Sequence, residues 1–258
     1  MAIRVGTHPI LKFYAGPVPP SWTPADLTDI TYWWNTGYGI VESGGALSTW
    51  TDQINGKVLT SYAGTAMTYT AADANVNNQP SVYQNGTYAT IYNSSITPVV
   101  IGGTDDYSII FIGKPETVGS AAYAIWGGNT STGAAASELA PYISSPDGAD
   151  VPGYYRFGYT GNGRTNTATT AGTSVVFHAV SYKNSTQTLT QYYNTTTANT
   201  TTTSAGSPID RDPFLFEIGG YSNSIRFKGR ILEAIVLKSV PTTQELTDLN
   251  TYVQNKYV

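Results

Sequence analysis

Cysteine is absent from the 258 residues, which excludes disulfides and any metal site built on thiolates. Charged residues make up only 12% of the chain, and the formal net charge is −4. A nucleic-acid-binding protein normally carries a basic stripe, and none is visible, so we expect no nucleic-acid partner. No apolar run approaches the roughly 20 residues of a membrane-spanning helix, so we expect no membrane insertion.

Short strand-like segments fill most of the chain, which contains 26 glycines and 20 tyrosines. The segment "DYSIIFIGK" (106–114) is apolar on both faces, as in a central strand. The segment "PSVYQNGTYATIYN" (80–93) predicts two strands joined as a hairpin by Asn85-Gly86. One helix is expected at the C-terminus, where Thr242 and Glu245 have capping-box spacing ahead of an apolar stripe. These patterns predict an all-β sandwich or jelly roll that ends in a short helix.

The first 24 residues differ from the rest, because five prolines interrupt them. Proline removes amide donors, so we expect an extended, ordered N-terminal arm (1–24) followed by a single domain (25–258). The arm carries apolar residues that a free linker would lack, so it needs a surface to lie on, either its own domain or another chain, and we favour anchoring on a partner chain. These residues are Ile10, Leu11, Phe13, Tyr14 and Trp22.

The order of several motifs resembles a known family. The segment "YWWNTGYGIVESGGALSTWTDQING" (32–56) resembles the opening of laminin G-like members of the concanavalin A-like lectin/glucanase superfamily. "YSIIFIGK" is similar to its central strand, "FHAVSYKN" to its His-x-Val-x-Tyr hairpin, and the segment from "FEIGG" to the terminal helix to its closing motif. The resemblance covers about residues 25–258 and implies a concanavalin A-like jelly-roll β-sandwich.

Catalytic patterns are missing. Glucanases of the superfamily carry Glu-x-Asp-x-x-Glu on one strand, which places the acids on one face of it. None of the six glutamates here is followed two residues later by Asp. Glu233, in step with Ile231 and Ile235, is interpreted as a hydrogen-bonded buried acid or the mark of a bulge. His178 lies in an apolar strand without catalytic partners and is expected in the core, so we expect no enzyme.

Ligand-binding candidates lie in expected loops. Lectin-like sites stack aromatic side chains on sugar faces, with amide and carboxyl groups nearby. The candidates for glycan binding are Tyr38, Trp126, Asn129, Tyr221 and Asn223. Asp105 and Asp106 are the candidates for a calcium ion, although calcium needs six to eight oxygens and aspartates in such a loop also serve as turn residues. No other cofactor is expected.

The arm, the composition and the superfamily together favour a non-enzymatic virion accessory protein, either a capsid decoration or fibre protein or a tail adhesin. Its partners would be other virion proteins and cell-surface glycans, as a homo-oligomer located in the virion. The alternative is a stand-alone, extracellular carbohydrate-binding module, and a glycosidase or lyase is a third hypothesis.

Overall fold

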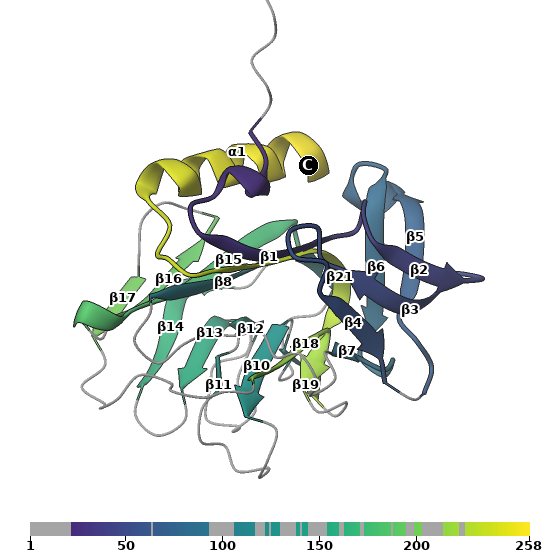
Figure 1. Cartoon of the computed structure of the whole chain (residues 1–258), viewed down its shortest axis with the longest axis horizontal. Coiled ribbons are helices and arrows are strands. Elements are labelled where there is room, and N and C mark those ends of the chain that lie inside the picture. The colour runs from purple at the N-terminus through teal and green to yellow at the C-terminus, as the bar shows by residue number, and fades with distance from the viewer. Residues whose placement is uncertain are drawn as a thin grey trace, which may run out of the picture.

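The structure of the chain is a computed structural model that describes residues 22–62, 64–92, 106–116, 122–123, 125–129, 138–139, 141–143, 154–159, 163–170, 173–186, 188–194, 199–202, 214–221 and 225–258. Within these ranges the chain is almost entirely β-strand, with three single-turn helices and one α-helix. The expected all-β sandwich with a short C-terminal helix is therefore confirmed (Figure 1). Residues Ile10, Leu11, Phe13 and Tyr14 of the expected arm lie outside the described residues.

The strands of the first third of the chain are β1 (Ile30–Asn35), β2 (Ile40–Ser43), β3 (Ala46–Thr51), β4 (Val58–Ser61), β5 (Thr68–Asp73), β6 (Gln79–Asn85) and β7 (Ile91–Tyr92). The middle contributes β8 (Tyr107–Pro115), β9 (Ala122–Tyr123), β10 (Ile125–Asn129), β11 (Glu138–Leu139), β12 (Pro141–Ile143), β13 (Tyr154–Tyr159) and β14 (Gly163–Thr170). The last third contributes β15 (Val176–Lys183), β16 (Thr188–Tyr193), β17 (Asn199–Thr202), β18 (Phe214–Ile218), β19 (Gly220–Tyr221), β20 (Ile225–Arg226) and β21 (Lys228–Leu237). The helices are η1 (Pro24–Asp26), η2 (Ala74–Val76), η3 (Asn184–Thr186) and α1 (Thr243–Tyr257).

The larger sheet curls on itself and faces a smaller one. Its path runs β11-β10-β18-β7-β4-β3-β5-β6-β21-β8-β15-β16-β17, with β1 paired to β21 and β2 to β3. The smaller sheet has the order β14-β13-β12-β9-β20-β19. In Figure 1 the strands β15, β8, β21 and β1 form an upper layer beneath α1, and β12, β13 and β14 lie below them. β21 is central to the upper layer, because it pairs with β1, β6 and β8.

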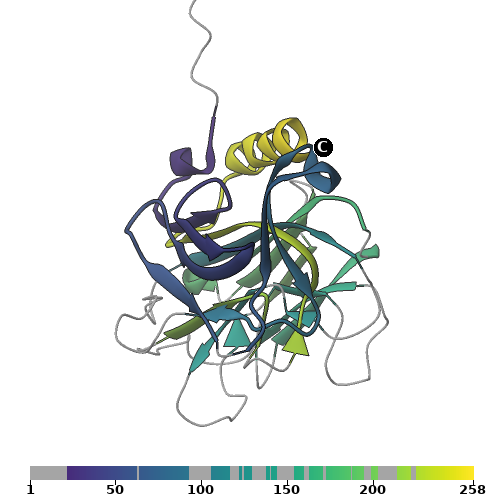
Figure 2. The same cartoon turned by 90° about the vertical axis from the view of Figure 1, so that its right-hand side faces the viewer.

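The upper layer has a separate core on each face. The inner core faces the interior of the curl and includes Trp34, Phe111, Phe216 and Phe227, all at most 1% exposed. The helix-side core lies between the sheet and α1 (Figure 2). Its sheet residues alternate with those of the inner core, which is the period of two expected of a strand buried on both faces.

The C-terminal helix follows the sequence pattern closely. Thr242 is its N-cap: the Thr242 hydroxyl accepts the Glu245 amide, and the Glu245 carboxylate accepts the Thr242 amide. This reciprocal capping box satisfies amides that would otherwise lack partners in the first turn. The buried stripe of α1 consists of Leu246, Leu249, Val253 and Tyr257. The helix therefore begins and packs as its local sequence dictates.

The expected hairpin at Asn85-Gly86 is wrong. β6 pairs with β5 and β21, whereas β7 pairs with β4 and β18, so the two strands are not neighbours. The Asn85 side chain accepts the amides of Thr87 and Tyr88, and the Gln84 side chain also binds the Tyr88 amide. These side-chain hydrogen bonds turn the chain into a loop that leaves β6 for another part of the sheet, instead of the tight turn that a hairpin needs.

Candidate functional site

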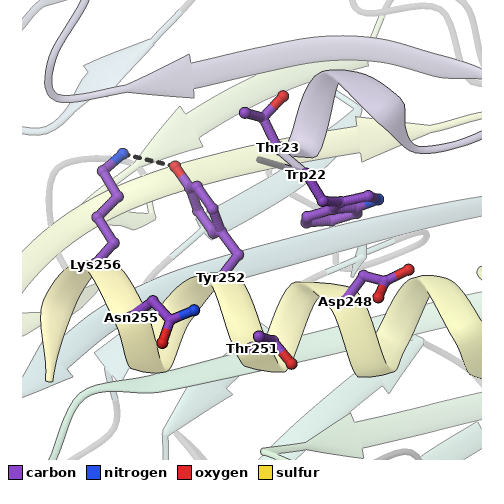
Figure 3. Close-up of a pocket in the computed structure, with 7 residues that line it drawn as sticks. All are labelled: Trp22, Thr23, Asp248, Thr251, Tyr252, Asn255 and Lys256. Atoms are coloured by element: carbon purple, nitrogen blue, oxygen red, sulfur yellow. Dashed lines mark hydrogen bonds between the residues drawn. The ribbon is translucent and has the colours of Figure 1, made fainter. Parts of the chain in front are cut away.

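A groove runs along the exposed side of α1, with Trp22 as its aromatic wall. Figure 3 shows the indole lying over the helix, between Tyr252 and Asp248. The Trp22 and Tyr252 ring centroids are 6.1 Å apart with an interplanar angle of 71°, an edge-to-face contact. Trp22 and Asp248 line two adjoining hollows of about 350 Å³ and about 490 Å³. We call the two hollows together the Trp22 groove.

Polar side chains spaced along α1 line the groove. The first hollow, drawn in Figure 3, is lined by Trp22, Thr23, Asp248, Thr251, Tyr252, Asn255 and Lys256. The second is lined by Trp22, Asp26, Thr28, Thr242, Gln244, Glu245 and Asp248. Residues 244, 248, 251 and 255 follow spacings of four, three and four, which places them on one face of a helix. Within the described chain, the side-chain amide of Asn255 has no hydrogen-bond partner, so it can bind a ligand.

Short-range capping and one long-range bond hold Trp22 in place. The next residue, Thr23, is the N-cap of η1, and its amide donates to Asp26 Oδ2 at 2.8 Å. The Thr28 amide donates to Glu245 Oε1 at 2.7 Å, across 217 positions of sequence. Burial raises the pKa of Glu245, but hydrogen bonds from Thr242 and Thr28 outweigh it and lower the pKa below its usual value. Glu245 thus caps α1 and also ties the segment after Trp22 to it.

A β-bulge in β21 turns the Glu233 side chain toward α1. The register between β21 and β8 shifts between Ile231 and Glu233, which lie opposite the adjacent residues Gly113 and Ile112. Ile231 belongs to the inner core, whereas Leu232 belongs to the helix-side core and Glu233 contacts α1. The extra residue of a bulge turns two successive side chains toward the same face. Both interpretations of Glu233 are therefore confirmed, but it does not share a face with Ile231.

The Glu233 carboxylate holds α1 through several donors. Tyr252 Oη donates to Glu233 Oε1 at 2.6 Å, Lys256 Nζ donates to the same oxygen at 3.0 Å, and Tyr257 Oη also donates to it. Trp33 Nε1 donates to Glu233 Oε2 at 2.7 Å. Burial, followed by the charge of Glu233, raises the pKa of both tyrosines, so they stay protonated and act as donors. This cluster, the Glu233 hub, fixes the ring of Tyr252 at the groove.

The described residues predicted to bind glycans lie on one turn and on two strands that contact each other. Tyr38 lies in the turn between β1 and β2 and is 48% exposed. Trp126 and Asn129 lie on strand β10, and Tyr221 lies on β19, so their expected position in loops is wrong. β10 and β19 contact each other, so Trp126, Asn129 and Tyr221 lie on neighbouring strands, whereas four strands separate β10 from β2 along the sheet. Asn223 lies outside the described residues, and the binding role of all five stays a prediction.

The structure gives no support to the calcium candidates among the described residues, whereas it confirms the core position of His178. Asp105 lies outside the described residues, and Asp106 Oδ1 accepts the Asn184 amide at 2.8 Å, which ties the start of β8 to the start of η3. The described residues contain no group of three or more His, Asp or Glu that could hold a metal ion. His178 is 1% exposed and contacts Gln191 Oε1 through Nε2 at 2.9 Å, so its core position is confirmed.

Sequence reasoning missed the Trp22 groove. It placed Trp22 in an arm that lies either on its own domain or on a partner, and the structure packs the indole on a helix of its own chain. The partner-anchoring role of the arm residues is not tested and stays a prediction. The signal that was present is the polar stripe at 244, 248, 251 and 255, which is rich in amide, hydroxyl and carboxyl groups and contains no lysine or arginine. Among the described helices, none has the length and apolar character needed to cross a membrane.

Comparison with known proteins supports the fold. No family model matches the chain, and no curated protein matches it. Among solved structures, domain 4 of AbnA, a GH43 extracellular arabinanase from Geobacillus stearothermophilus in complex with arabinotriose, has a TM-score of 0.61 at 14% identity. That alignment covers 87% of this chain and 100% of the domain.

Two further structures share the fold. A GH54 α-L-arabinofuranosidase has a TM-score of 0.61 at 15% identity over 83% of this chain, which spans about half (52%) of that enzyme. The CBM40 of the Ruminococcus gnavus IT-sialidase, bound to α2,3 sialyllactose, has a TM-score of 0.50 at 15% identity, covering 66% of this chain and 96% of that one. At these identities the likeness shows the fold alone, which is a lectin/glucanase-like β-sandwich.

The comparisons correct two expectations. The main prediction, a virion accessory protein, is contradicted, because the solved structures named above that share this fold belong to carbohydrate-active proteins. The prediction that the chain is no enzyme is contradicted by the same structures, since glycoside hydrolases are among them. The expected homo-oligomer and location are not tested and stay predictions.

Proposed function

We propose that this chain is a carbohydrate-binding domain and that the Trp22 groove receives the glycan. One observation carries the proposal: a partly exposed indole stands over a helix face that presents amide, hydroxyl and carboxyl groups on both sides of it. Sugars combine apolar C–H faces with hydroxyl groups, so they need an aromatic surface and convergent polar partners together.

The groove is organised in advance of any ligand. The Thr23–Asp26 contact and the Thr28–Glu245 bond fix the segment that carries Trp22. The Glu233 hub fixes Tyr252 on the opposite side. Groups held in place by the fold lose little conformational entropy on binding, which favours a site that recognises small, flexible sugars.

The fold comparisons support the same class of ligand. The arabinanase domain was solved with arabinotriose and the CBM40 with α2,3 sialyllactose, so domains of this architecture bind sugars in two other proteins. We extend from them only the ligand class, since the identities are 14% and 15%.

The test is a glycan array followed by calorimetry on the hits, using the full chain and a Trp22→Ala variant. We expect specific binding that falls at least ten-fold in the variant, because the aromatic wall is removed while the fold is retained. Tyr38→Ala and Trp126→Ala are the matched aromatic controls. Binding that survives Trp22→Ala but is lost in Trp126→Ala would place the site on β10 instead. The hits are also incubated with the protein and examined for cleavage products, which tests a glycosidase or lyase activity directly.

A further inference from the structure

One of the two hollows of the Trp22 groove has an acidic lining. Asp26, Glu245 and Asp248 line the hollow beside the start of α1. Thr28 and Gln244 are among the other lining residues, and the described lining of this hollow contains no lysine, arginine or histidine. Any ligand in it therefore meets carboxylates that no cation of the lining offsets.

The one cation of the other hollow is already committed. Lys256 Nζ lies 3.0 Å from Glu233 Oε1 and 2.6 Å from Tyr252 Oη. It also lies 4.9 Å from the ring centroids of both Tyr252 and Tyr257. Its charge balances the buried Glu233 carboxylate, and pulling it toward a ligand anion would leave that carboxylate unpaired at high cost. Lys256 therefore does not offset the acidic side chains of the groove.

We infer that the groove selects neutral glycans and discriminates against acidic ones, such as those that carry sialic or uronic acids. This inference rests on the proposed function. Sugar hydroxyls donate to carboxylates, and such charge-assisted hydrogen bonds are stronger than neutral ones, so the acidic lining favours a neutral sugar. A ligand carboxylate near Asp248 or Asp26 is instead repelled, and like charges placed together are a common source of specificity.

The discrimination has an expected size. A carboxylate pair about 6 Å apart near a protein surface repels enough to weaken binding by roughly five- to ten-fold after screening. Because these side chains are partly exposed, the effect weakens with salt, and we expect it to shrink to about two-fold at high ionic strength.

The experiment is a glycan array of matched pairs, in which each neutral oligosaccharide stands beside its sialylated or uronic-acid counterpart, at low and high salt. We expect each Trp22-dependent hit to bind at least five-fold better in its neutral form at low salt. Asp248→Asn should reduce the ratio of neutral to acidic binding by two- to three-fold. Glu42→Gln, which removes a carboxylate from exposed β2, is the matched control and should leave the ratio unchanged.

The outcomes separate the two proposals. If no glycan binds, the proposed function fails and this inference fails with it. If glycans bind in a Trp22-dependent manner and the acidic member of each pair binds as well as the neutral one, the proposed function stands and neutral selectivity is overturned. A ratio that is unchanged in Asp248→Asn and at high salt would also overturn it, because the selectivity would then not be electrostatic.

Discussion

Trp33 and Trp34 are adjacent in sequence and serve two different cores. Trp34 faces the inner core, where it is fully buried and stacks on Phe216 with ring centroids 5.0 Å apart. Trp33 faces α1 and donates its indole N–H to Glu233. The inner core is held by packing, whereas the helix-side core adds a buried carboxylate with four side-chain donors. Packing gives the sandwich its stability, and the Glu233 hub fixes the position of the helix that carries the groove.

The largest expected effect comes from breaking the inner core. Trp34→Ala removes a fully buried indole that contacts Phe216, and the sheets cannot collapse into the space. We expect a loss of about 4 kcal/mol in the free energy of unfolding, as for other large-to-small core changes. Urea denaturation measures it. A loss below about 1 kcal/mol would contradict the assignment of the inner core as the main source of stability.

The second effect comes from breaking the Glu233 hub. Glu233→Gln keeps the size of the side chain but removes the charge that pairs with Lys256. The Glu233 side chain is fully buried and accepts four donors, but the Lys256 side chain is 27% exposed, so we expect a loss of about 3 kcal/mol, at the low end for a broken buried pair. Glu116→Gln is the control: it breaks the pair with Arg230, but the Glu116 side chain is 32% exposed, so we expect a loss of less than about 1 kcal/mol. Similar losses in the two variants, measured by urea denaturation, would mean that the hub is no stronger than a surface pair.

The sequence predicted what local chemistry decides and missed what distant residues decide. The start and apolar stripe of α1 depend on residues within one or two turns, and both were predicted. Trp33 meets Glu233 across 200 positions, and Thr28 meets Glu245 across 217, so neither contact leaves a local pattern. The Trp22 groove depends on both contacts, so the sequence did not predict it. Only the polar stripe that lines the groove leaves a pattern in the sequence.

The smallest expected effect concerns His178, a buried titratable group on the inner-core face of β15 whose pKa is strongly shifted. Burial lowers the pKa of His178 to about 4, and the hydrogen bond with Gln191 only partly opposes it. The unfolded chain, with an ordinary value of 6.5, then binds protons more readily than the folded one, so stability is lost as the pH falls from 6.5 toward 4. We expect a loss of about 2 kcal/mol between pH 7 and pH 5.

Urea denaturation at several pH values tests this, with His178→Gln as the comparison. The variant is expected to be less stable at pH 7 but to lose less stability between pH 7 and pH 5. An unchanged pH dependence in His178→Gln would show that another group is responsible. The result would sharpen the contrast between the two cores. The inner core keeps His178 neutral, whereas the charged Lys256 pairs with Glu233 at the helix-side core.

The pairing of β21 with β1, β6 and β8 also has a consequence for synthesis. β21 is the last described strand, yet it is the one that joins the early strands to the middle of the upper layer. While the ribosome is still translating the first two hundred residues, β1, β6 and β8 lack their shared neighbour and have unpaired edges. Pairing across such sequence separations is slow and leaves these edges open to wrong partners. Nascent chains stalled before residue 228 should therefore depend on chaperones that shield strand edges, and chains that extend through α1 should not.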